Sequence, residues 1–244
     1  MSSVAQISEE AKAEHESALA KLHKLNKEKE WLENRRTRFT VSEYVRLMGY
    51  EDNPDYETKL TKGGISYAYE KYLEEISTFS KSFSTASTEH GNEFEVDAAV
   101  RFMDETGLKV HNFGDDQEFI KLGKDLGCTP DGLIEDWAGL ETKCPDSKTQ
   151  DQYLNDIKGQ ESFKEVCKKY YWQIMGSMYI TGRKSWYFVS YDPRMISEDE
   201  QILILRIDRN ENDIEKLKNR LRMAIGYKLS LLKKRAKRKP LRIV

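Results

Sequence analysis

The sequence predicts an α/β fold in which a mixed central β-sheet is flanked by helices. Up to Gly107 the chain consists mainly of runs with helical periodicity. Short apolar segments between Gly, Pro and Asp follow, and these indicate strands and turns. Helix-like and strand-like segments then alternate without an internal repeat or a linker. One domain is therefore expected over residues 31–227, between an N-terminal helix and a C-terminal tail.

Four helices are expected before the first strand, at residues 1–30, 45–48, 65–76 and 89–106. Residues 1–30 contain no Pro or Gly and place apolar residues at mostly helical spacing among Glu and Lys, which predicts an exposed amphipathic helix. Thr40 or Ser42 can cap the second helix, which Gly49 would end. The Gly63-Gly64 pair is expected to break the chain before the third helix, and Gly107 is expected to close the fourth.

Three short segments, at residues 109–113, 127–134 and 138–143, are interpreted as strands and turns, and two further segments, at residues 185–191 and 201–207, are strand candidates. A hairpin turn is expected at residues 135–139, between the second and third of them. One long helix over residues 163–181 would separate the third strand from the fourth. The last helix would begin near Asn212 and carry apolar residues along one face.

Composition excludes several classes of protein. Apolar residues make up 38% and charged residues 34% of the chain, against typical shares of about 45–50% and 25%. No stretch approaches the roughly 18 apolar residues of a membrane span. The first residues are acidic, unlike a signal peptide, so a cytoplasmic location and no membrane partner are expected. Three cysteines without a CxxC pair argue against a disulfide framework or a four-thiolate metal site, so any metal would be held by oxygen.

Charge is unevenly distributed along the chain. Of the 40 basic residues, eight lie in residues 228–242 with no acidic residue among them, which leaves 32 basic against 42 acidic residues elsewhere. Residues 228–244 are therefore expected to form a basic tail that continues the last helix. A basic run of this kind is consistent with a solvated surface and also with an arm that follows DNA phosphates.

The segment that carries the chemistry is CTPDGLIEDWAGLETKCP, residues 128–145. Asp131 follows a proline, and Glu141 and Lys143 lie two apart on an expected strand, so that they point to the same face. With a hairpin between them, two carboxylates and an ammonium converge. Oxygen ligands of this kind hold Mg²⁺ or Mn²⁺, which polarises a phosphate oxygen and activates water. The alternative for the bare pattern is a surface hairpin with an exposed Glu–Lys pair.

The residues around this pattern, CTPDGL and GLETKCP, resemble the PD-(D/E)xK nuclease core of the phage lambda exonuclease family, the YqaJ-like viral recombinases. Three further segments are similar to that family in the same order. They are WLENRRTRFTVSE at 31–43, GNEFEVDAAVRFMDETG at 91–107 and YYWQIMGSMYITGRKSWYFVSYDPRM at 170–195. The resemblance covers residues 31–195 and implies a restriction-endonuclease-like PD-(D/E)xK core.

The resemblance also implies a set of catalytic residues, which are Glu95, Asp131, Glu141, Lys143 and Gln173. Asp131 and Glu141 would bind the metal together with the backbone carbonyl of Thr142. Glu95 would add a third carboxylate, consistent with two Mg²⁺ ions, for which Mn²⁺ is a possible substitute. Lys143 would position or activate the nucleophile, and Gln173 would orient water or phosphate. Without the resemblance, Glu95 is better interpreted as an exposed helix acid and Gln173 as a buried amide.

A pocket for a terminal 5′-phosphate is implied at Arg35, Ser42 and Thr129. The family has a serine at the position of Thr129, and a threonine hydroxyl can still donate to phosphate. Arg36 and Arg38 lie close to Arg35 in the sequence, so any of the three arginines could bind the phosphate. A solvated basic loop is the remaining alternative for this segment.

The resemblance implies a Mg²⁺-dependent 5′–3′ exonuclease that acts on linear double-stranded DNA ends and leaves a 3′ overhang for phage-type recombination by strand annealing. It further implies a homotrimeric ring, a single-strand annealing protein as partner, and a phage- or prophage-encoded protein in the bacterial host cell.

Two alternatives remain. One is a PD-(D/E)xK endonuclease or a RecB-like nuclease subunit, although a four-cysteine cluster and helicase motifs are missing from the sequence. The other is a DNA-binding scaffold with a degenerate core, against which the complete set of Asp131, Glu141 and Lys143 argues.

Overall fold

The computed structural model describes residues 4–49, 55, 57–78 and 86–238, and the chain divides into two units, Met1–Arg36 and Thr37–Val244. The first unit is one helix, α1 (Val4–Arg35), which is longer than the predicted 1–30. Its extension follows from WLENR, which contains neither Gly nor Pro. Leu19, Leu22 and Leu25 of α1 are each more than half exposed.

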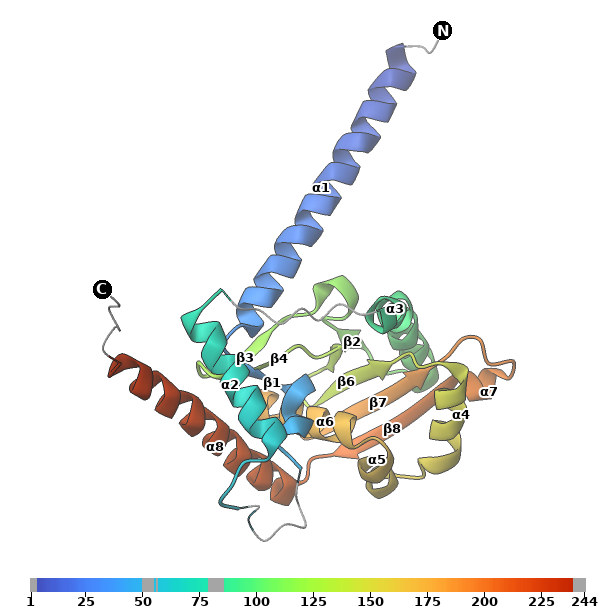
Figure 1. The fold of residues 1–244 in the computed structure, drawn as a ribbon. Helices are drawn as coiled ribbons and strands as arrows, with labels where there is room; N and C mark the ends of the chain where they lie inside the picture. Colours follow the sequence, from blue (N-terminus) through green and yellow to red (C-terminus); the bar gives the residue numbers. More distant parts are fainter. Residues whose placement is uncertain (1–3, 50–54, 56, 79–85, 239–244) are drawn as a thin grey trace, which may run out of the picture. The chain divides into compact units, whose positions relative to one another are not determined.

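The second unit is built on a five-stranded mixed sheet with the order β2-β5-β6-β7-β8 (Figure 1). The strands are β2 (Val110–His111), β5 (Gly132–Ile134), β6 (Ala138–Lys143), β7 (Ser185–Tyr191) and β8 (Ile202–Asp208). Only β6 and β7 are parallel, and the other three pairs are antiparallel. The predicted mixed sheet is confirmed, and the parallel pair brings the C-terminal ends of β6 and β7 to the same edge.

A second, three-stranded sheet has the order β1-β4-β3, from β1 (Phe39–Thr40), β4 (Leu126–Cys128) and β3 (Ile120–Leu122). The segment 127–134, expected to contain strand and turn with Asp131 in a turn or strand end, holds parts of two strands, β4 and β5, which belong to different sheets. Pro130 lies between them and has no backbone N–H to donate to a ladder, so the strand ends there. As a result, Asp131 lies in the connection between the two sheets.

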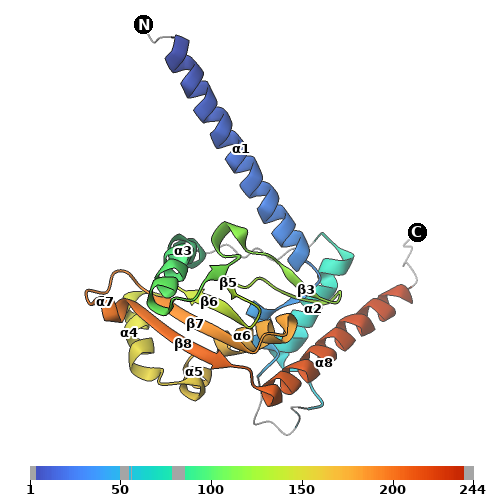
Figure 2. The same ribbon diagram turned by 180° about the vertical axis from the view of Figure 1, so that it is seen from behind.

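Helices cover both faces of the five-stranded sheet (Figures 1 and 2). The helical elements of the second unit are η1 (Val41–Arg46), α2 (Lys62–Ile76), α3 (Ala86–Thr106), η2 (Gly114–Asp116), α4 (Ser147–Asp156), α5 (Gln160–Val166), α6 (Lys168–Thr181), α7 (Glu198–Gln201) and α8 (Glu211–Ala236). Phe102 of α3 shares a buried cluster with Leu140 and Val189 of the sheet. Trp172 of α6 shares the larger cluster with Phe188, which lies on the other face. None of the described helices is both long and apolar enough to cross a membrane.

Several helix boundaries differ from the prediction. The single helix expected over residues 163–181 is two helices, α5 and α6, because Cys167 adopts a non-helical conformation with φ −116° and ψ 43°. The Gly63-Gly64 pair lies inside the first turn of α2 and not before it, since Thr61 caps the helix by accepting a hydrogen bond from the Gly64 N–H at 2.8 Å. Helix α4 was missed, although Asp146 caps it as the N-cap rule would predict.

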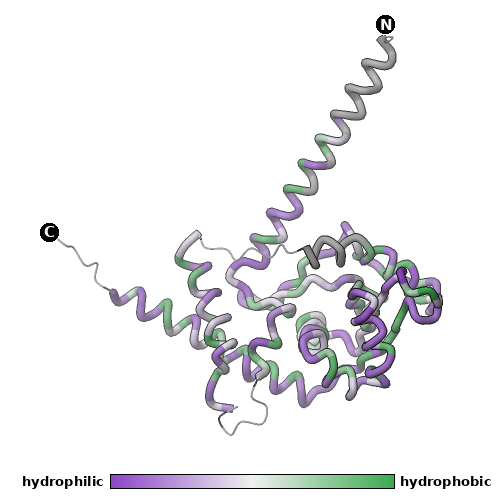
Figure 3. Tube along the Cα trace, turned by 45° about the vertical axis from the view of Figure 1, so that its right-hand side comes forward, coloured by the Kyte–Doolittle hydropathy of each residue, from purple (hydrophilic) through white to green (hydrophobic). Residues whose placement is uncertain are grey.

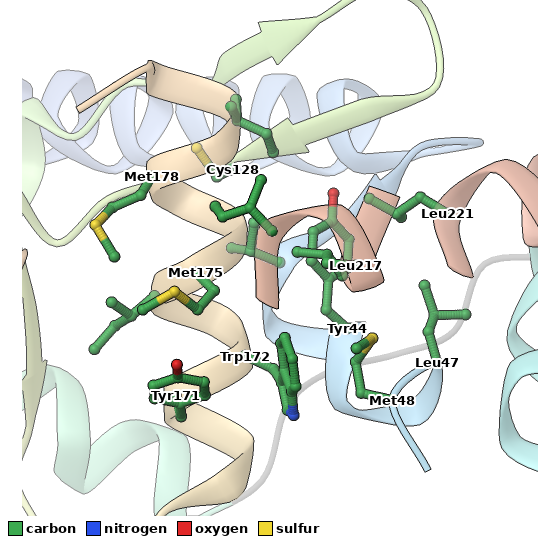
Figure 4. Close-up of a cluster of buried hydrophobic side chains, with 14 of the residues drawn as sticks. Tyr44, Leu47, Met48, Cys128, Tyr171, Trp172, Met175, Met178, Leu217 and Leu221 are labelled. Atoms are coloured by element: carbon green, nitrogen blue, oxygen red, sulfur yellow. The ribbon is translucent and has the colours of Figure 1, made fainter. Parts of the chain in front are cut away.

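The larger apolar cluster positions α6 against η1 and α8 (Figure 4). Trp172 and Met175 of α6 lie in this cluster with Tyr44 of η1 and Leu217 of α8. A Cβ atom on Gly176 would lie 2.5 Å from Cδ2 of Tyr44, so only glycine allows the two elements to approach this closely. The packing fixes α6, which carries Gln173.

The basic tail begins differently from the prediction. Lys228, its expected first residue, is buried, and its ammonium bonds to Asp125 at 2.7 Å and to Glu75 at 3.3 Å. The last turn of α8 contains Lys233, Lys234 and Arg235 and is hydrophilic (Figure 3). Lys228 therefore holds α8 against Glu75 and Asp125 within the second unit. The solvated basic segment begins beyond Lys228.

Candidate active site

The β5–β6 hairpin brings Asp131 to the strand that carries Glu141 and Lys143. Gly132 pairs with Leu140 and Ile134 pairs with Ala138, so the residue before β5 lies beside the C-terminal half of β6. One carboxylate oxygen of Asp131 accepts hydrogen bonds from the Thr142 N–H at 2.7 Å and from the Thr142 hydroxyl at 3.2 Å. The structure thus places Asp131, Glu141 and Lys143 together.

The ammonium of Lys143 lies among three oxygen groups. It donates to the backbone carbonyl of Thr142 at 2.6 Å, forms an ion pair with Glu141, and lies 3.5 Å from an oxygen of Asp131. The Lys143 side chain as a whole is about a quarter exposed. The oxygens of Asp131, Glu141 and the Thr142 carbonyl are the ones expected to bind metal, and all three groups face the Lys143 ammonium.

Glu141 is fully buried, and Gln173 contacts it from α6. The Gln173 amide donates from Nε2 to Oε1 of Glu141 at 2.6 Å. The other carboxylate oxygen, Oε2, is buried and has no hydrogen-bond partner in the described part of the chain. A buried, unpartnered carboxylate oxygen is energetically costly unless a ligand completes it.

Glu95 approaches the same group from α3. Its carboxylate accepts a hydrogen bond from the amide of Gln117, which lies just after η2, and its charge interacts with those of Asp131 and Lys143. Gln117 was not identified from the sequence, where it belongs to no recognised motif. Only the folded chain brings it to Glu95.

Burial and mutual repulsion shift the titration of the carboxylates. Burial, followed by the negative charge of Asp131, raises the pKa of Glu141 to about 8 and that of Glu95 to about 7, although Lys143 opposes both shifts. Burial alone would lower the pKa of Lys143, but Glu141 and Asp131 outweigh it and raise that pKa well above its usual value. The lysine therefore stays charged, while the glutamates exchange protons near neutral pH.

Tyr170 is a second residue that the sequence did not reveal. The Lys143 ammonium lies 5.3 Å from the centroid of the Tyr170 ring, which is itself stacked on Phe188 at a centroid distance of 5.8 Å. Cation–π contacts of this kind hold a charged side chain on one side of a ring. In the sequence, the spacing of three residues between Tyr170 and Gln173 could have placed the tyrosine on the same helix face, and thus near the site.

The residues present fit a divalent metal ion. The donors are hard oxygens from Asp131, Glu141 and the Thr142 carbonyl, and the unpartnered Oε2 of Glu141 supplies a further lone pair. No group of three His, Cys, Asp or Glu side chains among the described residues is arranged to hold an ion. The candidate donors are therefore two carboxylates and a carbonyl, with the Glu95 carboxylate near Asp131 and Lys143.

The residues expected to bind a 5′-phosphate come from three different segments of the chain. Thr129 lies between β4 and Asp131, and its hydroxyl is buried without a hydrogen-bond partner in the described ranges. Ser42 lies on η1, which packs against α6. Arg35 lies in the first unit, where its guanidinium is 4.3 Å from the centroid of the Trp31 ring.

Comparisons with known proteins identify the family and the fold. Residues 30–184 match the YqaJ-like viral recombinase domain. No curated protein matches the chain in sequence. The fold is similar to that of LHK-Exo, an alkaline exonuclease from Laribacter hongkongensis, with a TM-score of 0.70 and 25% identity over 85% of this chain and 97% of that one.

Two further crystal structures are similar. LHK-Exo in complex with dAMP gives a TM-score of 0.69 and 26% identity over the same shares of the two chains. A phage-related exonuclease from Haemophilus somnus 129PT, 18% identical with a TM-score of 0.67, covers 81% of this chain and 96% of its own, and shares the fold. Because the recombinase-domain match spans more than half of the sequence, the chain belongs to the YqaJ-like viral recombinase domain family.

Proposed function

We propose that this protein is a metal-dependent deoxyribonuclease that degrades one strand of linear double-stranded DNA from its 5′ end. The observation that carries the proposal is the convergence of Asp131, Glu141 and the Thr142 carbonyl on the Lys143 ammonium. The similarity to LHK-Exo, an alkaline exonuclease that has been solved with dAMP, supports an exonuclease acting on DNA.

Asp131, Glu141 and the Thr142 carbonyl would hold Mg²⁺, or Mn²⁺ in its place. When bound, the ion would polarise the scissile phosphate and lower the pKa of a water molecule. Lys143 would then orient this nucleophile and offset negative charge on the phosphate. Gln173 would keep the Glu141 carboxylate in one orientation through its 2.6 Å hydrogen bond. Glu95, held by Gln117, would contribute to a second ion that stabilises the leaving oxygen.

The 5′ polarity rests on the phosphate pocket. A hydroxyl that is buried without a partner, as in Thr129, is available to donate to a phosphate oxygen beside Asp131. Ser42 and Arg35 would complete the pocket, since charge-assisted arginine–phosphate contacts are strong and specific. The product would be a 3′ overhang, the substrate of a single-strand annealing partner in phage recombination, and the active form would be a homotrimeric ring.

Linear duplex DNA labelled at either the 5′ or the 3′ end tests the reaction. We expect Mg²⁺-dependent release of the 5′ label as mononucleotide, no release in EDTA, and intact covalently closed circles. Cleavage of the circles would establish the endonuclease alternative. Retention of both labels in Mg²⁺ and in Mn²⁺ would refute nuclease activity.

The same assay tests the phosphate pocket. Wild-type protein should prefer a 5′-phosphorylated end to a 5′-hydroxyl end, and Thr129→Val should reduce this preference by about tenfold, or roughly 1.4 kcal/mol. Because the hydroxyl is unpartnered, we expect the substitution to leave the free energy of unfolding unchanged or slightly higher. Equal rates on both ends in the wild type would contradict the pocket.

A further inference from the structure

The sequence YDPRM, Tyr191–Met195, begins with the last residue of β7, and the reaction described above gives it no role. It lies at the edge of the sheet that carries the candidate site, because β6 and β7 are parallel and Lys143 pairs with Ser190. That pair is the last rung of the β6–β7 ladder. Beyond it, the chain leaves β6 through Cys144 and Pro145.

Two side-chain contacts continue the connection between the segments where the ladder stops. The guanidinium of Arg194 donates from Nη2 to the carbonyl of Pro145 at 2.8 Å. The hydroxyl of Ser147 donates to Oδ2 of Asp192 at 2.5 Å. Because proline has no N–H, Pro145 cannot extend the backbone ladder, and its carbonyl is held by a side chain instead.

Asp192 and Arg194 are joined to each other as well. Nε of Arg194 donates to Oδ1 of Asp192 at 2.6 Å, so one planar guanidinium bonds both to the carboxylate and to the Pro145 carbonyl. The Asp192 side chain is fully buried, and both its oxygens accept hydrogen bonds. The Arg194 side chain is 45% exposed, so its loss would leave the buried Asp192 carboxylate without its cation, which is costly.

We propose that Asp192 and Arg194 are positioning residues that hold the C-terminal end of β6, and with it the Thr142 carbonyl and the Lys143 side chain, in the active site. The inference rests on the proposed function for its catalytic consequence. Strand ends fray when their last rungs lack support, and Lys143 is the last paired residue of β6. The Arg194–Pro145 bond acts two residues beyond it.

The chain contains a similar but more exposed group at the other end of the same strands, where the Asp208 side chain is 65% exposed. Nε of Arg206 donates to Asp208 at 3.0 Å, and the Ser185 hydroxyl donates to the same carboxylate at 2.8 Å. Ser185 begins β7, so this arginine, aspartate and serine repeat the chemistry of the first group at the end of β7 away from Lys143. Replacing Arg206 therefore measures the effect of losing an arginine–aspartate pair that is remote from Lys143 and the candidate active site.

The experiment compares Arg194→Met, Arg194→Lys and Arg206→Met with wild-type full-length protein. Amide hydrogen exchange over residues 138–147, the Mg²⁺ dissociation constant from calorimetry, and kcat and KM on 5′-phosphorylated linear duplex are measured. For Arg194→Met we expect exchange at Lys143 and Cys144 to be about tenfold faster and kcat about tenfold lower, with KM within about twofold. Arg194→Lys should not rescue kcat, because one ammonium cannot reproduce the planar fork.

Arg206→Met should stay within about twofold of wild type in every measurement. If Arg194→Met does not fold, Ser147→Ala, which removes only one of the two contacts, should show the same changes at smaller size. Unchanged exchange over residues 138–147, or equal effects of the Arg194 and Arg206 variants, would overturn the proposal. If the wild type does not cleave DNA, the proposed function fails, while exchange and Mg²⁺ binding still decide whether Arg194 positions the end of β6.

Discussion

Asp131 and Lys143 can be removed without opening the apolar core, because both side chains are partly exposed at the edge of the sheet. We expect Asp131→Ala and Lys143→Ala each to reduce strand degradation by about a thousandfold or more, or roughly 4 kcal/mol at the transition state. The unfolding midpoint should change by only a few degrees. Rates from the end-labelled duplex assay and thermal unfolding measure the two effects.

Asp136→Ala is the control, since this exposed aspartate lies in the turn between β5 and β6. It should leave the rate unchanged. Turnover close to wild type in either Asp131→Ala or Lys143→Ala would show that the site is wrongly assigned.

The glutamates predict a pH dependence. Glu95 and Glu141 have pKa values raised from 4.5 to about 7 and about 8, so between about pH 4.5 and 8 the folded protein binds more protons than the unfolded chain. In EDTA, the free energy of unfolding should therefore fall as pH rises through this window. Mg²⁺ requires the ionised carboxylates, so its affinity should rise up to about pH 8 and level off above it.

Calorimetric Mg²⁺ titrations at pH 6, 7, 8 and 9, with thermal unfolding in EDTA, check both trends. Glu95→Gln should remove the step near pH 7 and move the Glu141 step below pH 8, because the Glu95 charge also raises the pKa of Glu141. A Mg²⁺ affinity that is constant over the whole range would contradict the raised pKa values.

At the scale of elements, the active site depends on how closely α6 approaches η1. Gly176→Ala would place a Cβ atom 2.5 Å from Cδ2 of Tyr44, so we expect a loss of about 1–3 kcal/mol in the free energy of unfolding from overpacking. The displaced helix should also move Gln173 away from Glu141 and lower kcat. Denaturant unfolding and the duplex assay provide the measurements.

Gly226 on α8 offers a matched control, because a Cβ atom there would meet nothing within 4 Å. Gly226→Ala should raise the free energy of unfolding by about 0.5–1 kcal/mol, as expected for alanine in an open helical position. If both alanine variants were stabilised, the close approach of α6 and η1 would be refuted.

Elements whose pattern is local could be predicted well. β6 and β7 have the predicted bounds, because each is a short segment that turn residues delimit on both sides. The sequence did not reveal β1 and β3, which are two and three residues long and are strands only because β4 pairs with both. The break between α5 and α6 at Cys167 was also missed, because neither Gly nor Pro stands there.

At the scale of the whole molecule, the basic end of α8 tests how the protein loads onto DNA. Lys228 is an internal anchor, so a truncation should remove residues 233–244 only. We expect the truncated protein to fold normally and to bind duplex ends more weakly. Each lost phosphate contact should reduce the slope of log affinity against log salt by about 0.9. An unchanged slope would show that the segment is only solvated surface.

Oligomeric state decides whether the proposed ring exists. Sedimentation should give a mass three times that of the 28.5 kDa chain, and degradation should remain processive after competitor DNA is added. The mass of a single chain together with short product ladders would refute the ring.

The sequence by itself determined the local arrangement of the candidate site. Asp131, Glu141, Lys143 and their flanking residues lie within one hairpin, where strand alternation and turn residues act over short range. Only the tertiary structure decided which groups surround them. Gln117 meets Glu95, Tyr170 meets Lys143, and Arg194 holds the Pro145 carbonyl through contacts between distant segments, which depend on helix packing and sheet order. No local sequence pattern predicts such contacts, because they form only when the whole domain packs its helices against its sheets.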